Sequence, residues 1–225
     1  EFVAKDNVAP AISRNRLLEE PAPHNYDRIS HPPSTYVQEK IKVEVRQPAA
    51  QRFIVEHGLN ELVAGERADL GIIVQGGITN VLLRGLDRLE VEGKVPTLVL
   101  NVTHPLVPDQ IADFCRGKRA VLVVEEGSPD YIEQAIHAIL RKRDLGTRIY
   151  GKDVLPMAGE YTAEVVTEGL LKFFAQCAND IDLAGPRERF EAARAGRAEA
   201  QRLLGGPLPL RPPGFCVGCP ERPVF

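Results

Sequence analysis

The middle of the chain alternates short apolar runs with segments of helical periodicity, and this alternation restricts the fold more than any other feature of the sequence. Leu70–Gln75, Pro96–Val102 and Ala120–Glu125 have the length of strands, and their nearly unbroken apolar character is typical of strands buried on both faces. Helical crossovers between such strands are right-handed and make neighbouring strands parallel. The sequence therefore predicts an α/β fold, a three-layer α/β/α sandwich with a mainly parallel sheet, over residues 48–180.

Helices are expected between these strands because bulky apolar residues recur there at helical spacing. Thr79 or Asn80 is expected to cap the first helix, and Ser128 the third, with Pro129 in its first turn. A short strand is expected at Thr147–Tyr150. The apolar stripes comprise Val81, Leu82, Leu86 and Leu89, then Ile111, Phe114 and Cys115, then Ile132, Ile136, Ile139 and Leu140, and finally Val166, Leu170, Phe173, Phe174 and Cys177.

Prolines gather at the two ends of the sequence and indicate linker-like segments there. Residues 1–47 are expected to form an extended arm, followed by a helix from Pro48 to His57 that ends at Gly58. Pro186–Leu204 is helical by propensity but has few bulky apolar residues, which predicts a solvated linker helix or one that needs a further neighbour.

Composition excludes several functional classes. The net charge of −3 and the absence of tryptophan and of any basic run argue against a nucleic-acid binder. The longest apolar runs are the length of strands, far short of the roughly 20 residues that span a membrane. Four cysteines, two of them isolated, fit a reducing cytoplasm better than a disulfide-rich exterior.

Two candidate sites follow from the expected sheet, because ligands of open parallel sheets bind at the carboxyl ends of the strands. Gly76 and Gly77 precede a helix and could cradle a phosphate, but a simple tight turn is favoured because the spacing matches no phosphate-binding motif. Glu125 and Glu126 could divide into acid and base, although adjacent strand residues face opposite sides. A structural role in capping or ion pairing is favoured for both.

The remaining candidates are histidines and cysteines. His104 stands alone after the second strand and is expected to be a loop residue, while Cys115 and Cys177 fall on helix stripes and are expected to be buried. Cys216 and Cys219 form a C-x-x-C pair in a Pro/Gly-rich tail, which is half of a four-ligand metal or cluster site. A redox dithiol is less favoured there, because no strand and helix surround the pair.

Five strings, in this order along the chain, resemble indolepyruvate ferredoxin oxidoreductase, of the thiamine-diphosphate-dependent 2-oxoacid:ferredoxin oxidoreductase family. They are Pro33–Lys40, Gly71–Gly77, Val121–Gly127 with Tyr131-Ile132-Glu133 after it, Gly151-Lys152 with Gly159-Glu160, and Cys216–Arg222. The resemblance implies that residues 1–47 extend from a preceding domain and that 48–180 form a transketolase C-terminal-like domain. It also implies that 181–225 contain a linker helix and the start of a thiamine-diphosphate-binding domain.

The resemblance further implies a non-catalytic interface domain in a larger enzyme. That parent would decarboxylate an arylpyruvate oxidatively, form an arylacetyl-coenzyme A and pass electrons to ferredoxin, using thiamine diphosphate, Mg²⁺ and iron–sulfur clusters. No cofactor is expected in this stretch by itself. Cys216 and Cys219 would be cluster ligands in the full-length protein, although Glu221 stands where histidine is expected in some members. The expected partners are the flanking domains, ferredoxin and coenzyme A, and a homo-oligomer is left open.

Two rivals remain. One is a stand-alone α/β module that binds a small anion at the Gly76-Gly77 turn, and the other is an acid–base enzyme that uses Glu125 or Glu126.

Overall fold

The computed structural model describes residues 29–206, which divide into two units at His57. The first unit is helical through α2 (Ser34–Ile41), the π-helical segment η3 (Lys42–Arg46) and α3 (Gln47–Glu56). The prediction of an extended arm is therefore wrong for residues 34–47. This stretch contains neither proline nor glycine. The wider π-helical turn ends two residues before Pro48, and the ring of a proline does not fit against the carbonyl four residues earlier in a regular α-helix.

The second unit is built on a five-stranded sheet with the strand order β1-β3-β2-β4-β5. The three central strands and β5 are parallel, and β1 is antiparallel to β3. The mainly parallel sheet predicted from the sequence is thus confirmed, and β1 is an addition to it. The strands are β1 (Glu61–Val63), β2 (Leu70–Gln75), β3 (Thr97–Leu100), β4 (Ala120–Val124) and β5 (Arg148–Tyr150).

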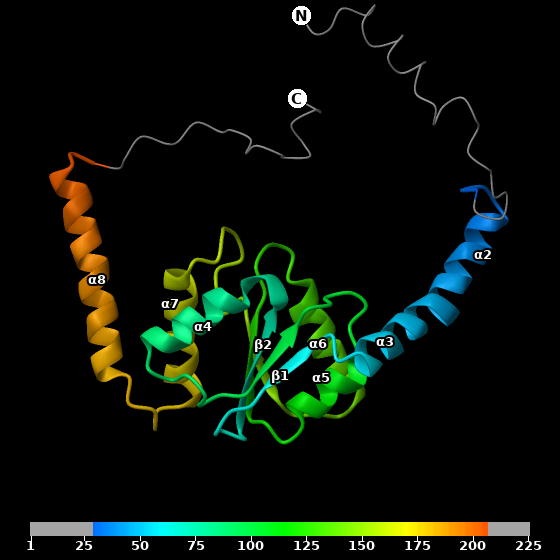
Figure 1. The fold of residues 1–225 in the computed structure, drawn as a ribbon, viewed down its shortest axis with the longest axis horizontal. Helices are drawn as coiled ribbons and strands as arrows, with labels where there is room; N and C mark the ends of the chain where they lie inside the picture. Colours follow the sequence, from blue (N-terminus) through cyan, green and yellow to red (C-terminus); the bar gives the residue numbers. More distant parts are fainter. Residues whose placement is uncertain (1–28, 207–225) are drawn as a thin grey trace, which may run out of the picture. The chain divides into compact units, whose positions relative to one another are not determined.

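Helices cover both faces of this sheet, which confirms the three-layer sandwich (Figure 1). One face carries α4 (Thr79–Arg88) and α7 (Ala163–Cys177), and the other carries α5 (Pro108–Cys115) and α6 (Tyr131–Lys142). Successive residues of a strand point to opposite faces. Val74 therefore packs with Leu170 and Phe173 in one core, and Ile73 packs with Ile136 in the other.

The last described helix, α8 (Ala184–Leu203), is exposed over most of its length, as expected of a solvated helix. Its first turns nevertheless join the core of the second unit, because Phe190 is buried beside the residues of α7. Arg194 and Arg197 form ion pairs with Glu164 of α7. The helix is therefore attached along α7 and is not purely a linker. No helix within residues 29–206 combines the length and the apolar character needed to cross a membrane.

Candidate functional site

The carboxyl ends of β2 and β4 meet the loop that follows β5, and polar side chains from all three segments form one hydrogen-bonded group. We call this group the carboxyl-edge cluster, and it consists of Gln75, Glu125, Glu126, Lys152 and Tyr161. The side-chain oxygen Oε1 of Gln75 accepts the backbone N–H of Glu126 at 2.8 Å and so links the ends of β2 and β4. Parallel strands bring these segments together although they are distant in sequence.

Glu125 caps helix α6. Its side chain is only 4% exposed, and its carboxylate accepts the backbone N–H of Ile132 at 2.9 Å and that of Glu133 at 3.0 Å. These donors belong to the first turn of α6, where amides lack partners within the helix and the helix dipole favours negative charge. The expectation that Ser128 caps this helix is wrong. The helix begins at Tyr131, beyond the reach that a cap at Ser128 requires, and the carboxylate at the end of β4 takes its place.

Lys152 occupies the centre of the cluster, and the sequence reasoning did not single it out as a functional residue. Its ammonium group donates to the carbonyl oxygens of Glu125 at 2.5 Å and Gly127 at 2.8 Å, and to the hydroxyl of Tyr161 at 2.8 Å. An ammonium has three N–H donors, so these close contacts use all of them. Lys152 thereby fastens the loop after β5 to the loop after β4.

Burial sets the protonation behaviour of these groups. Desolvation lowers the pKa of Lys152, and nearby carboxylates oppose the change. Desolvation also raises the pKa of Tyr161 to about 12, and the same carboxylates reinforce that shift. The Tyr161 hydroxyl donates to the carbonyl of Pro156 at 2.6 Å. The tyrosine is thus a neutral donor that holds a loop, not a group ready to give up its proton at neutral pH.

Glu126 serves a different segment from Glu125. Its carboxylate accepts the backbone N–H of Tyr161 at 2.5 Å, just ahead of α7. The two adjacent glutamates therefore have separate partners, in agreement with the alternating directions of neighbouring strand residues. The structure gives both carboxylates hydrogen-bond donors from backbone.

The Gly76-Gly77 turn forms a short 3₁₀ segment, η4 (Gly76–Ile78), ahead of α4. A Cβ atom on Gly76 would lie 2.4 Å from Oδ1 of Asn101 and 3.0 Å from its Cα, whereas one on Gly77 would meet nothing within 4 Å. The two glycines therefore differ, and close approach of the chain after β3 explains only Gly76. Neither Thr79 nor Asn80 caps α4, because η4 precedes it and the Thr79 hydroxyl instead donates back to the Gln75 carbonyl at 3.5 Å. Cofactor binding at this turn stays a prediction.

The other candidates lie apart from the cluster. His104 is exposed in the loop after β3. Cys115 and Cys177 are buried free thiols, and desolvation raises their pKa to about 12 and about 11 respectively, so they are unreactive at neutral pH. No group of three or more His, Cys, Asp or Glu side chains in the described part of the chain could hold a metal ion. Cys216 and Cys219 lie outside the described residues, and their role as ligands stays a prediction.

Comparison with known proteins identifies relatives. The chain is 29% identical over 160 residues to the indolepyruvate oxidoreductase subunit IorA of Methanothermobacter marburgensis, which covers 70% of this chain and 22% of the relative. It is 30% identical over 178 residues to subunit IorA of Archaeoglobus fulgidus, covering 78% of this chain and 25% of the relative. The chain thus spans about a quarter of the length of these relatives. They confirm the resemblance found in the ordered sequence strings.

Solved structures and family models add little to this relationship. A 2-oxoglutarate:ferredoxin oxidoreductase from Magnetococcus marinus matches at a TM-score of 0.42 and 20% identity, covering 64% of this chain and 24% of that one. An inactive tetramer of a split-gene transketolase matches at 0.39 and 20% identity, covering 50% of this chain and 41% of that one. No protein-family model matches the chain.

Proposed function

We propose that this chain, which is related to the IorA subunits of indolepyruvate oxidoreductases, forms a structural and interface domain of a larger 2-oxoacid oxidoreductase. The observation that supports this proposal best is the match to three IorA subunits over 160 to 178 residues, about a quarter of their length. Residues 48–180 would be a middle, transketolase C-terminal-like domain, and residues 181–225 would lead into the next domain.

The parent enzyme would convert an arylpyruvate and coenzyme A into an arylacetyl-coenzyme A and carbon dioxide, with two electrons passed to ferredoxin. Bound thiamine diphosphate would supply the carbanion chemistry of decarboxylation, and iron–sulfur clusters would carry the electrons. Cys216 and Cys219 are the candidate cluster ligands in such a polypeptide. The described residues would contribute a rigid sheet edge and not a reacting group.

The carboxyl-edge cluster does not fit thiamine diphosphate or its metal ion. The Glu125 carboxylate already accepts two helix amides and is almost fully buried, so it is not available to a cofactor. The ammonium of Lys152 has its three N–H donors engaged by groups of the same unit. No described group of acidic or histidine side chains could hold Mg²⁺. We therefore derive no catalytic step from these residues.

An interface role agrees with what the cluster leaves exposed. Tyr131, the first residue of α6, is 70% exposed, and Met157, in the loop that Lys152 and Tyr161 anchor, is 45% exposed. Large side chains held on a rigid support lose little entropy on association, and Tyr and Met are enriched in protein interfaces. The hydrogen-bonded cluster would keep these two loops in the shape that a neighbouring domain contacts.

The test uses the longer polypeptide that the proposal requires, assayed for indolepyruvate- and coenzyme A-dependent reduction of a viologen dye. Because Glu125 and Lys152 act on folding, Glu125→Gln and Lys152→Met should reduce the amount of folded enzyme but leave kcat per folded molecule within about twofold. A loss of kcat of about a hundredfold or more in a correctly folded Glu125→Gln enzyme would assign that residue to catalysis. Absence of turnover with every arylpyruvate would reject the parent activity.

A further inference from the structure

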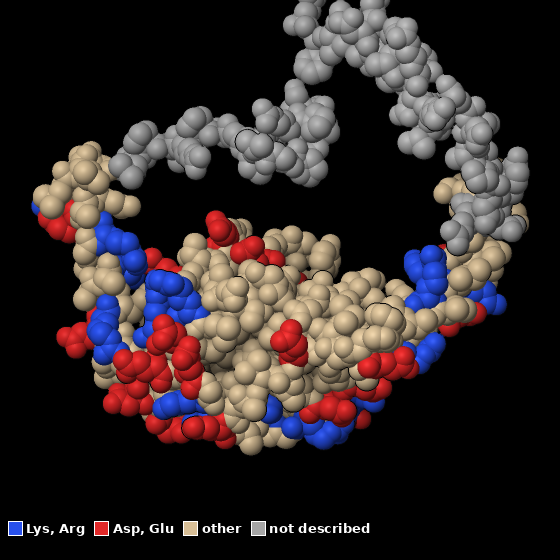
Figure 2. Space-filling view, viewed as in Figure 1, with Lys and Arg blue, Asp and Glu red and all other residues tan. Residues whose placement is uncertain are grey.

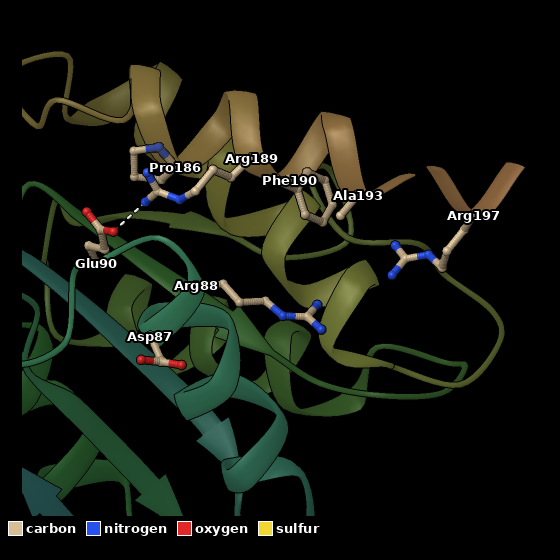
Figure 3. A pocket seen from close by; sticks show the side chains of 8 residues that line it. All are labelled: Asp87, Arg88, Glu90, Pro186, Arg189, Phe190, Ala193 and Arg197. Carbon is tan, nitrogen blue, oxygen red and sulfur yellow. Dashed lines mark hydrogen bonds and ion pairs between the residues drawn. The ribbon is translucent and has the colours of Figure 1, made fainter. Parts of the chain in front are cut away.

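A groove of about 320 Å³ lies between the C-terminal end of α4 and residues 186–197 of α8, and it shares no residue with the carboxyl-edge cluster. Arginine side chains from both helices line it, and Pro186 and Phe190 provide its apolar surface (Figure 3). Figure 2 shows Lys and Arg side chains gathered where α4 and α8 lie beside each other, with carboxylates among them. A volume of this size is at the lower end of that of small-molecule sites.

Two of the three guanidinium groups in the groove are already paired. Arg189 bonds to the carboxylate of Glu90, and Arg197 bonds to the carboxylate of Glu164 at 2.5 Å. Arg88 is half-buried and has no hydrogen bond or ion pair with any residue between 29 and 206. Figure 3 shows its guanidinium extending toward Arg197 and away from the Asp87 carboxylate.

A half-buried guanidinium without a protein acceptor keeps its N–H donors available to water or to an incoming oxyanion. Arginine presents a planar set of N–H donors that matches two oxygens of a phosphate or carboxylate. Phe190 also lines the groove, and apolar surface near a charge lowers the local dielectric and strengthens such a bond. The groove thus offers donors that an incoming oxyanion would satisfy.

We propose that this groove binds a small phosphorylated molecule, with Arg88 as its bidentate phosphate ligand. This site is independent of the proposed parent enzyme, because neither the IorA relationship nor the carboxyl-edge cluster enters the argument. The volume suits a phosphate with a short organic group and is small for a nucleotide.

Inorganic phosphate is the probe, titrated into the isotopically labelled chain and followed by amide chemical shifts at constant ionic strength. The wild-type chain should show saturable shifts at the end of α4 and the start of α8, with a dissociation constant in the millimolar range, on the order expected for one charge-assisted contact. Arg88→Gln should weaken binding about tenfold or more. Arg88→Lys, which keeps the charge and loses the fork, should weaken it less.

Arg84→Gln is the matched control, because it removes the same charge as Arg88→Gln. Arg84 is exposed one turn earlier on α4 and lies outside the groove. Its dissociation constant should equal that of the wild type. Equal weakening in Arg84→Gln and Arg88→Gln would show a general effect of surface charge and reject the site. So would the absence of saturable shifts in the wild type, or tighter binding of acetate than of phosphate in a parallel titration.

Discussion

The carboxyl-edge cluster and the groove between α4 and α8 both hold charged side chains near helix ends, but they use them differently. In the cluster, Glu125 is buried and Lys152 is half-buried, and each is bonded to several groups of its own unit. In the groove, Arg88 is half-buried and has no partner among the described residues. The two regions thus differ in bonding: charges with complete internal bonding serve the fold, whereas an unpaired charge in a cavity is available to a ligand.

The largest effect is expected from Glu125→Ala, which tests the cluster directly. The change leaves buried amides of α6 without an acceptor, so the free energy of unfolding should fall by about 3 kcal/mol. Urea denaturation at neutral pH measures the loss. Glu160→Ala, which removes an exposed carboxylate in the neighbouring loop, should change stability by less than about 0.5 kcal/mol. Equal effects of the two substitutions would mean that Glu125 does not act as a cap.

Lys152→Met should follow, with a loss of about 2 kcal/mol. The carbonyls of Glu125 and Gly127 and the Tyr161 hydroxyl would lose a donor in a place that water reaches poorly. Removal of the desolvated charge offsets part of that cost. Thermal unfolding measures the loss of stability. Lys142→Met, which removes an exposed ammonium from α6, is the control. A stability gain in Lys152→Met would show that the ammonium is not part of the folding network.

Alanine substitutions at the two glycines after β2 should differ in their effect on the free energy of unfolding, by a smaller amount than the two changes above. Gly76→Ala would push against Asn101, whose side chain also bonds to Leu59 and Glu61, and should cost about 1 kcal/mol. Gly77→Ala meets no atom within 4 Å and should be neutral or slightly stabilising, because it restricts the unfolded chain. The midpoint of urea denaturation distinguishes them. A larger loss for Gly77→Ala would point to a backbone constraint at that residue.

The smallest effect concerns a paired but exposed carboxylate at the amino end of β2. Hydrogen bonds from Arg67, and then from Arg119, hold the pKa of Asp69 well below its ordinary value of 3.8. The folded pKa is thus below the unfolded one, so the stabilisation is present above pH 3.8 and is lost as pH falls through the folded pKa. The side chain is 40% exposed, and solvent screening limits the contribution to about 0.5 kcal/mol.

Asp69→Asn should accordingly be less stable than the wild type at neutral pH, with the difference shrinking steadily below about pH 4. Thermal unfolding across this pH range follows the difference. A constant gap at every pH would exclude an origin in the charge of Asp69.

The sequence predicted the sheet well because its central strands are apolar on both faces, and periodicity recognises such runs. Strand β1 was not predicted, because it has three exposed residues and no apolar run. The helical stretch at 34–47 was not predicted, because the prolines on either side of it favour extended backbone, and this expectation was applied to the whole segment. The role of Lys152 could be recognised only in the folded structure, because two of its acceptors are carbonyls 25 and 27 residues away in sequence. No sequence signal marks Arg88, because its lack of a partner within residues 29–206 is visible only in the folded chain.

Calorimetric titration of thiamine diphosphate with Mg²⁺ into the 225-residue chain tests the central claim most directly. The structural role assigned to the carboxyl-edge cluster predicts no saturable heat at ligand concentrations up to about 1 mM. Binding at micromolar concentration, lost in Glu125→Gln while the free energy of unfolding stays unchanged, would contradict it.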